Sequence, residues 1–120
     1  MNRLLIVDDA LIMRMKIRQL AQAAGWEVVA EGKNGAEGVE LFREHAPDMV
    51  TLDMVMPELD GLSALKAIRD ADADAQVVMV SAVDQKEKLR ECIAAGAMDF
   101  IVKPFDDARM TEFFELYRQA

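Results

Sequence analysis

The chain has few residues that carry out chemistry through sulfur or imidazole. Its 120 residues contain one cysteine, Cys92, and one histidine, His45. A lone cysteine cannot form an internal disulfide, which is typical of proteins in the reducing cytoplasm. Because His45 falls at the expected end of a helix, away from the other reactive side chains, the sequence offers no Ser-His or Cys-His catalytic pair.

Positive charge and long apolar runs are also scarce. Lys and Arg number 14 against 22 Asp and Glu, a net charge of -8. This excess disfavours binding to nucleic acid or anionic membranes; it suits a cation or a basic partner, or simply solubility. No apolar run approaches the length of a membrane span, and the run after Met1-Asn2-Arg3 is too short for a signal peptide. We therefore expect a cytoplasmic protein without membrane insertion.

Length and composition fit one globular domain. Hydrophobic residues make up 52% of the chain and charged residues 30%, and 120 residues are enough for one compact core. We expect a single domain over residues 1–120, with no linker and no second domain.

Short apolar runs alternate with helical patterns five times. The apolar runs, which predict strands, lie at 4–7, 27–31, 49–52, 76–80 and 100–102. The helices expected between and after them lie at 10–24, 34–46, 60–70, 84–96 and 106–117. Their starts are marked by Asn34, Asp60, Asp84 and either Asp106 or Asp107 as caps, and three of their ends by Gly25, Pro47 and Gly96. This order predicts an α/β fold with a parallel sheet and helices on both faces.

Four of the five apolar runs end in a reactive polar side chain. These side chains are Asp8-Asp9, Asp53, Ser81 and Lys103. The carboxyl ends of parallel strands lie along one edge of a sheet, so the side chains are expected to converge there. Asp53 alone is explained as easily by helix capping or the end of a strand, and it is the convergence that favours a site.

The expected cluster suits acceptance of a phosphoryl group. Three carboxylates repel one another unless a cation joins them, and their oxygens suit Mg²⁺, with Mn²⁺ as an alternative. A carboxylate such as Asp53 can take a phosphoryl group as an acyl phosphate. Lys103 offers a charge and Ser81 a hydroxyl donor for the phosphoryl oxygens.

Several motifs resemble the receiver domain of two-component response regulators, most closely the free-standing chemotaxis type. In order and at family spacing, these motifs are Leu5-Ile6-Val7-Asp8-Asp9, Leu52-Asp53-Met54-Val55-Met56-Pro57 with Asp60-Gly61, Ser81-Ala82, and Ala95-Gly96-Ala97 through Phe100-Ile101-Val102-Lys103-Pro104-Phe105. The resemblance implies a doubly wound, flavodoxin-like (βα)5 fold with strand order 2-1-3-4-5.

The resemblance also implies metal and phosphoryl roles. Asp53 matches the phosphorylated aspartate, Asp9 a direct Mg²⁺ ligand, and Asp8 its partner that acts mainly through water. The backbone carbonyl of Val55 matches a further ligand. Ser81 matches the hydroxyl residue that moves to the phosphoryl oxygens.

Three further features follow from the same resemblance. Lys103 matches the lysine that contacts the phosphoryl group, and its bond to Pro104 is expected to be cis, which X-Pro bonds adopt at small cost. Phe100 matches the aromatic switch residue, although a plain core role stays open. Val55 and Val83 stand where polar side chains often orient the hydrolytic water, so we expect slow self-dephosphorylation.

The function implied is a phosphorylation-activated switch without a separate substrate, and therefore not an enzyme in the usual sense. A histidine kinase would be the phosphodonor, and the surface of the fourth helix, fifth strand and fifth helix would bind the output partner. That partner is expected to be a flagellar motor switch protein. Alternatives are a phosphorelay step to a histidine phosphotransfer protein, or the receiver domain of a larger regulator. We expect a monomer.

Two other classes fit the sequence less well. Aspartyl-phosphate phosphatases need Asp-x-Asp after the first strand, and Asp8-Asp9-Ala10 breaks that pattern. A flavin carrier needs a Gly/Ser/Thr-rich phosphate loop there, and two carboxylates would repel the flavin phosphate.

Overall fold

The computed structural model describes residues 2–82 and 84–119, and it confirms the predicted alternation of strands and helices. The strands are β1 (Arg3–Val7), β2 (Glu27–Gly32), β3 (Met49–Asp53), β4 (Val77–Ala82) and β5 (Asp99–Lys103). The helices are α1 (Leu11–Ala23), α2 (Gly35–His45), α3 (Gly61–Ala71), α4 (Lys86–Ala94) and α5 (Asp107–Tyr117). Most predicted boundaries are met within one or two residues.

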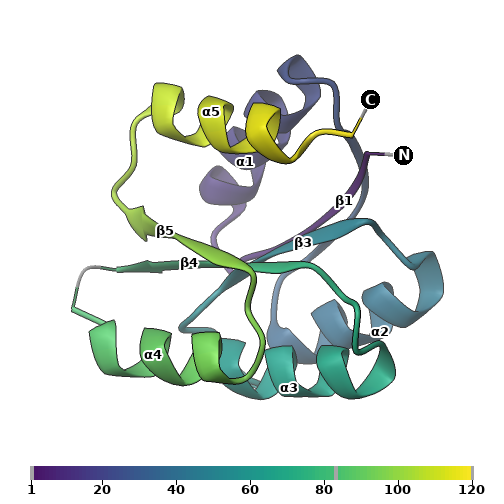
Figure 1. Ribbon diagram of the computed structural model, residues 1–120, viewed down its shortest axis with the longest axis vertical. Helices are drawn as coiled ribbons and strands as arrows, with labels where there is room; N and C mark the ends of the chain where they lie inside the picture. The colour runs from purple at the N-terminus through teal and green to yellow at the C-terminus, as the bar shows by residue number, and fades with distance from the viewer. Residues whose placement is uncertain (1, 83, 120) are drawn as a thin grey trace.

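The five strands form one parallel sheet in the order β2-β1-β3-β4-β5, as the resemblance implied. Helices α1 and α5 cover one face, and α2, α3 and α4 cover the other (Figure 1). The winding changes direction between β1 and β3, whose carboxyl ends therefore leave a crevice between helices of opposite faces. Within the described ranges, no helix combines the length and apolar character that crossing a membrane requires.

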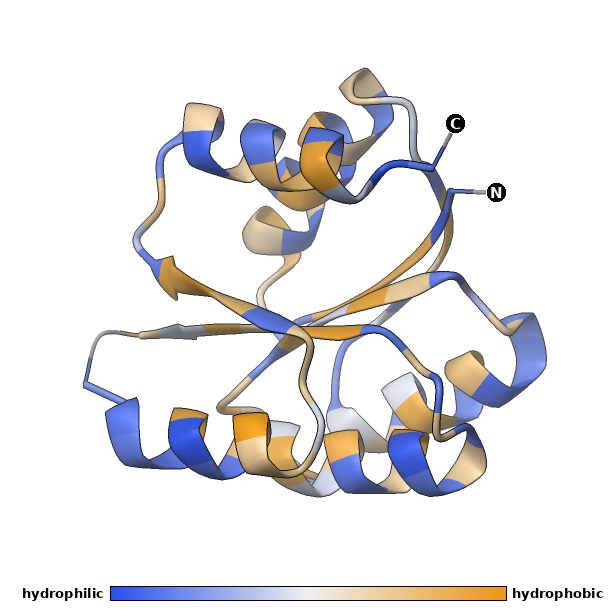
Figure 2. Ribbon diagram, viewed as in Figure 1, coloured by the Kyte–Doolittle hydropathy of each residue, from blue (hydrophilic) through white to orange (hydrophobic). Residues whose placement is uncertain are grey.

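The sheet separates two apolar layers, because each strand has alternate side chains on opposite faces. Leu5, Val50, Leu52 and Met79 pack under α2, α3 and α4, whereas Leu4, Ile6, Met49 and Val78 pack under α1 and α5. Figure 2 shows this as orange between the sheet and the helices, with blue on their outer sides. The central strands are buried on both faces and are therefore held firmly.

The side chains at the helix starts explain most of the boundaries. Asn34, Asp60 and Asp106 each accept a hydrogen bond from the backbone amide three residues later, at 2.8 Å, as the cap predictions required. The prediction of Asp84 as a cap is wrong. The helix α4 begins at Lys86, with Gln85 in the cap position and no side-chain cap bond. A later start moves the Asp84 carboxylate outside capping reach.

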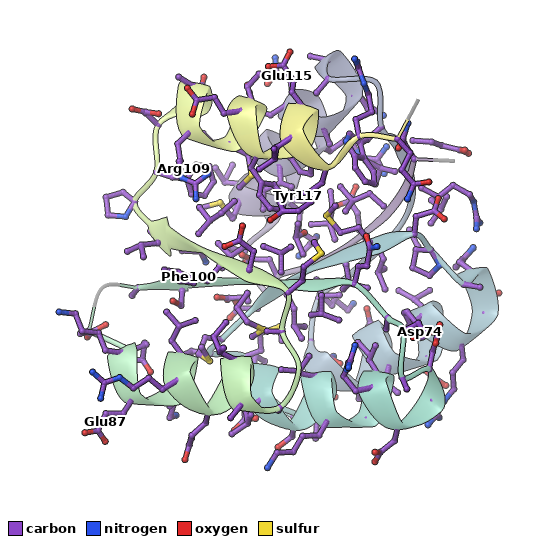
Figure 3. The ribbon with its side chains drawn as sticks, viewed as in Figure 1. Asp74, Glu87, Phe100, Arg109, Glu115 and Tyr117 are labelled. Carbon is purple, nitrogen blue, oxygen red and sulfur yellow. The ribbon has the colours of Figure 1, made fainter. Side chains whose placement is uncertain are left out.

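Contacts of aromatic residues hold α5 in place: Trp26, just before β2, packs against Phe114 and donates from its indole nitrogen to the Phe114 carbonyl at 2.9 Å. Phe113 packs against both Phe114 and Tyr117, and the Tyr117 hydroxyl donates to Asp99 Oδ2 at 2.9 Å. In Figure 3, Tyr117 lies on the side of α5 that faces the sheet, and Glu115 points away from it. Because Asp99 opens β5, this hydrogen bond ties α5 to the strand that ends in Lys103.

Candidate functional site

The ends of β1, β3 and β5 bring three charged side chains into contact, as the strand pattern predicts. Lys103 Nζ lies 3.1 Å from Asp8 Oδ2 and 3.2 Å from Asp53 Oδ1. The bond between Lys103 and Pro104 is cis, as expected. The ammonium thus joins two carboxylates that come from neighbouring strands in the middle of the sheet.

Asp53 is buried, with 7% of its surface exposed, and its Oδ1 also accepts from the amide of Met54 at 2.9 Å. Burial raises the pKa of this carboxyl from 3.8 to about 6, and the charge of Asp8 adds to the rise, while Lys103 opposes it. Burial also disfavours the charge on Lys103, but Asp53 and Asp8 outweigh it and the pKa of Lys103 is raised. The ionised form of Asp53 at neutral pH therefore lowers the free energy of unfolding.

This destabilisation predicts a pH-dependent effect of Asp53→Asn on stability. The folded carboxyl has the higher pKa, so folding binds a proton between pH 3.8 and about 6, and stability falls as the pH rises through that window. Without divalent cations, the variant should be more stable than wild type at pH 7 by roughly 2–3 kcal/mol, with little difference near pH 3. Urea denaturation across this range measures the difference. The exposed Asp70→Asn is the control, and a wild-type advantage at pH 7 would contradict the prediction.

Asp8 is held from several sides, whereas Asp9 is exposed. The Asp8 amide donates to the Gly32 carbonyl at 3.0 Å, and Asp8 Oδ1 accepts from the Ala10 amide at 2.9 Å. One carboxylate oxygen from each of Asp8, Asp9 and Asp53 lies within 4.8 Å of the others. Three hard oxygen donors beside one ammonium leave net negative charge, so this donor set fits Mg²⁺.

Ser81 lies on β4 directly after Val80, the residue paired with Asp53 of β3, and it is 1% exposed. Within residues 2–82 and 84–119, its hydroxyl has no hydrogen-bond partner. Thr51, in the middle of β3, is unpaired in the same way among the described residues, so it is the place of Ser81 near the end of β4 that leaves its hydroxyl available to a group bound at this edge of the sheet.

A cavity of about 430 Å³ extends from Ser81 along α4 and β5. Phe100 lines it and is 38% exposed, which places its ring in an outward position instead of the apolar core. Ile93 of α4 also lines the cavity and is exposed. Ser81 and Phe100 therefore line the same cavity.

Val55 lies two residues after the end of β3 and is 57% exposed. Because its side chain is apolar, it offers no polar group near the site. Val83, the other valine of the predicted slow dephosphorylation, lies outside the described residues.

Two contacts behind Asp53 were not predicted, although Gly61 belongs to one of the motifs that carry the resemblance. The amide of Gly61 donates to the Met54 carbonyl at 2.9 Å, and a Cβ added at Gly61 would lie 2.3 Å from the Asp53 carbonyl oxygen. The buried Met54 side chain meets the fully buried thiol of Cys92, with Sγ 3.6 Å from Sδ. Burial raises the pKa of Cys92 to about 11. These contacts join the segment after Asp53 to α3 and α4.

Comparison with known proteins agrees with this geometry. The family model for the response regulator receiver domain matches residues 4–115 of this chain. Two relatives are chemotaxis proteins CheY, from Bacillus subtilis at 52% identity over 92% of both chains, and from Thermotoga maritima at 47% over the same shares. A similar solved structure is the CheX–CheY–BeF₃–Mg²⁺ complex of Borrelia burgdorferi, with a TM-score of 0.90, 31% identity, and coverage of 98% of this chain and 90% of that one. With these matches along nearly its whole length, the chain belongs to the response regulator receiver family.

Proposed function

We propose that this protein is a phosphorylation-controlled switch in chemotaxis signalling and that Asp53 is the residue phosphorylated. The observation that carries the proposal is the convergence on Asp53 of the Lys103 ammonium and the Asp8 and Asp9 carboxylates. The Ser81 hydroxyl, unpaired among the residues described and one residue beyond the β4 partner of Asp53, supports it. The chemotaxis relatives at about half identity support the pathway. The receiver would span residues 1–120, and the buried free Cys92 fits a cytoplasmic location.

In the proposed reaction, a carboxylate oxygen of Asp53 attacks the phosphorus of a phosphohistidine on a sensor kinase. The phosphorus–nitrogen bond breaks, the histidine leaves, and Asp53 carries an acyl phosphate. Asp8, Asp9, Asp53 and the Val55 carbonyl would hold Mg²⁺, or alternatively Mn²⁺, which when bound offsets the charge of the phosphoryl oxygens.

Lys103 and Ser81 would receive the phosphoryl oxygens. Lys103 already contacts Asp53 Oδ1, so a small displacement brings its ammonium to the new group. The Ser81 hydroxyl has no competing bond to break among the residues described. The protein therefore assists its own modification and acts on no separate substrate.

The proposed switch uses the cavity between α4 and β5. When Ser81 moves toward the phosphoryl group, Phe100 can fill the space beside it, and the surface of α4, β5 and α5 changes shape. Moving a two-state equilibrium from 1:99 to 99:1 requires about 5.5 kcal/mol. Hydrogen bonds to a charged group contribute roughly 1.5–3 kcal/mol each, so Lys103 and Ser81 could supply much of it.

Binding to candidate partners tests the proposal. Two baits are compared: wild type treated with fluoroberyllate and Mg²⁺, and the Asp53→Asn variant. Each bait is offered to a flagellar motor switch protein, a histidine phosphotransfer protein and a CheX-like protein. We expect the motor switch protein to bind the activated wild type more tightly. Preference for the phosphotransfer protein alone would instead support a phosphorelay, and equal binding of both baits to every partner would contradict a switch at Asp53.

The two valines predict a long-lived phosphorylated state. Replacing Val55 with Asn and Val83 with Glu should supply polar groups that orient the attacking water. We expect dephosphorylation to be about tenfold faster, a barrier lower by about 1.4 kcal/mol. Loss of phosphoprotein after removal of the donor measures the rate, with Val55→Ala as the control. An unchanged rate in the double variant would show that hydrolysis is limited elsewhere.

A further inference from the structure

We propose that Arg14 is a positioning residue for the acidic site, because its guanidinium ties the backbone of Asp8 to Glu31 on β2. Arg14 Nη1 donates to the Asp8 carbonyl oxygen at 2.6 Å, and Arg14 Nε donates to Glu31 Oε1 at 3.2 Å. The Arg14 side chain is 14% exposed and that of Glu31 22%. A planar guanidinium has donors on two edges and can make both contacts at once.

The carbonyl that Arg14 holds belongs to the peptide unit between Asp8 and Asp9. The preceding unit is held by the bond from the Asp8 amide to the Gly32 carbonyl, at 3.0 Å. Fixing both units determines the direction in which Asp9 leaves the strand. Ala10, the cap residue of α1, has no side chain that could do this. Arg14 instead fixes the Asp8 carbonyl, just before the helix, by donating to it from the first turn of α1.

Glu31 is itself anchored, which makes it a firm partner. Arg18 Nε donates to Glu31 Oε2, while Arg14 occupies Oε1. Glu31 lies on β2 opposite Ile6 of β1, two residues before Asp8. The chain of contacts thus runs from α1 through the edge strand β2 to the turn that carries Asp8 and Asp9.

Charge and position predict opposite effects of removing Arg14. If its positive charge acted only at a distance, its loss would make the three carboxylates bind a divalent cation more tightly. If it positions Asp8 and Asp9, its loss makes binding weaker, as replacements of outer contacts to metal ligands usually do. This step rests on the proposed function, because it takes the carboxylates of Asp8, Asp9 and Asp53 as the site that binds the cation.

Calorimetric titration of the unphosphorylated protein with Mg²⁺ tests the inference. We expect Arg14→Ala to bind Mg²⁺ about tenfold more weakly than wild type. Arg18→Ala is the matched control, since it removes the same charge from the same carboxylate but leaves the bond to the Asp8 carbonyl. Because it loosens Glu31 but keeps the contact with the Asp8 carbonyl, it should bind Mg²⁺ clearly more tightly than Arg14→Ala. Arg14→Lys keeps the charge without the two-edged fork and should be weakened several-fold.

A second measurement does not involve the metal. The Ala10 amide, which bonds to Asp8 Oδ1 at 2.9 Å, should exchange with solvent faster in Arg14→Ala than in Arg18→Ala. Equal or tighter Mg²⁺ binding by Arg14→Ala would overturn the inference.

If Arg14→Ala does not fold, wild-type affinity in both Arg14→Lys and Glu31→Gln would overturn it. Wild type that binds no Mg²⁺ would overturn this inference and the proposed metal site together. Normal Mg²⁺ binding without phosphorylation of Asp53 would overturn the proposed function alone.

Discussion

Replacing Asp53 with Asn should abolish phosphorylation by acetyl phosphate and Mg²⁺. The amide cannot serve as the attacking oxygen anion, and it also removes one of the three clustered carboxylates. The fold should tolerate the change, because an amide has nearly the shape of the carboxylate and removes a buried charge. Intact-protein mass spectrometry measures the gain of one phosphoryl group.

The matched control is Asp9→Asn, which changes a carboxylate of the same cluster that is exposed and not expected to accept the group. It should slow labelling and require more Mg²⁺, yet leave the product on Asp53. Labelling of Asp53→Asn at the wild-type rate would refute the assignment of the phosphoacceptor. Loss of labelling in both variants, with peptide mapping of wild type to another residue, would refute it equally.

The second large effect is expected at Gly61, which supports Asp53 from behind. A methyl group there would lie 2.3 Å from the Asp53 carbonyl oxygen and 2.8 Å from Met54 Cα. Both contacts are backbone and cannot move aside as a side-chain tip would. Gly61→Ala should therefore shift the end of β3 and destabilise the protein by about 3 kcal/mol. Labelling by acetyl phosphate should also slow, because the Asp53 carboxylate moves relative to Lys103.

Urea denaturation measures the first effect of Gly61→Ala, and initial labelling rates at saturating Mg²⁺ measure the second. Ser63→Ala is the control, since Ser63 is exposed in the same first turn and the variant keeps the bond from its backbone amide to Asp60. It should match wild type in both measurements. Wild-type stability of Gly61→Ala would mean that the loop yields without cost and that the close approach has no structural role.

The fold was largely predictable from local patterns. Apolar runs without polar alternation indicated strands buried on both faces, and Asn34, Asp60 and Asp106 marked helix starts that the structure confirms. The strand order came from resemblance, because periodicity alone does not say which strands are neighbours. The start of α4 was mispredicted, since Asp84 has the right residue type but lies one position too early.

The site was predictable only in part. Reactive residues at strand ends carry a visible signal, so the proximity of Asp8, Asp53 and Lys103 could be expected. The contact of Arg14 with the Asp8 carbonyl could not, because an arginine in a helix looks like any solvent-facing charge. Gly61 belongs to a motif that the resemblance named, but its closeness to Asp53 depends on how the loop folds back and could not be predicted.

The meeting of Cys92 with Met54 has a consequence for kinetics. The thiol has no exposed surface and a pKa near 11, so a thiol reagent can reach it only when α4 lifts from the sheet. The rate of Cys92 alkylation therefore reports how often α4 opens. Met54, which follows Asp53, contacts the Cys92 thiol directly. Comparing the alkylation rate of Cys92 before and after addition of fluoroberyllate would show whether a group bound at Asp53 changes the opening of α4.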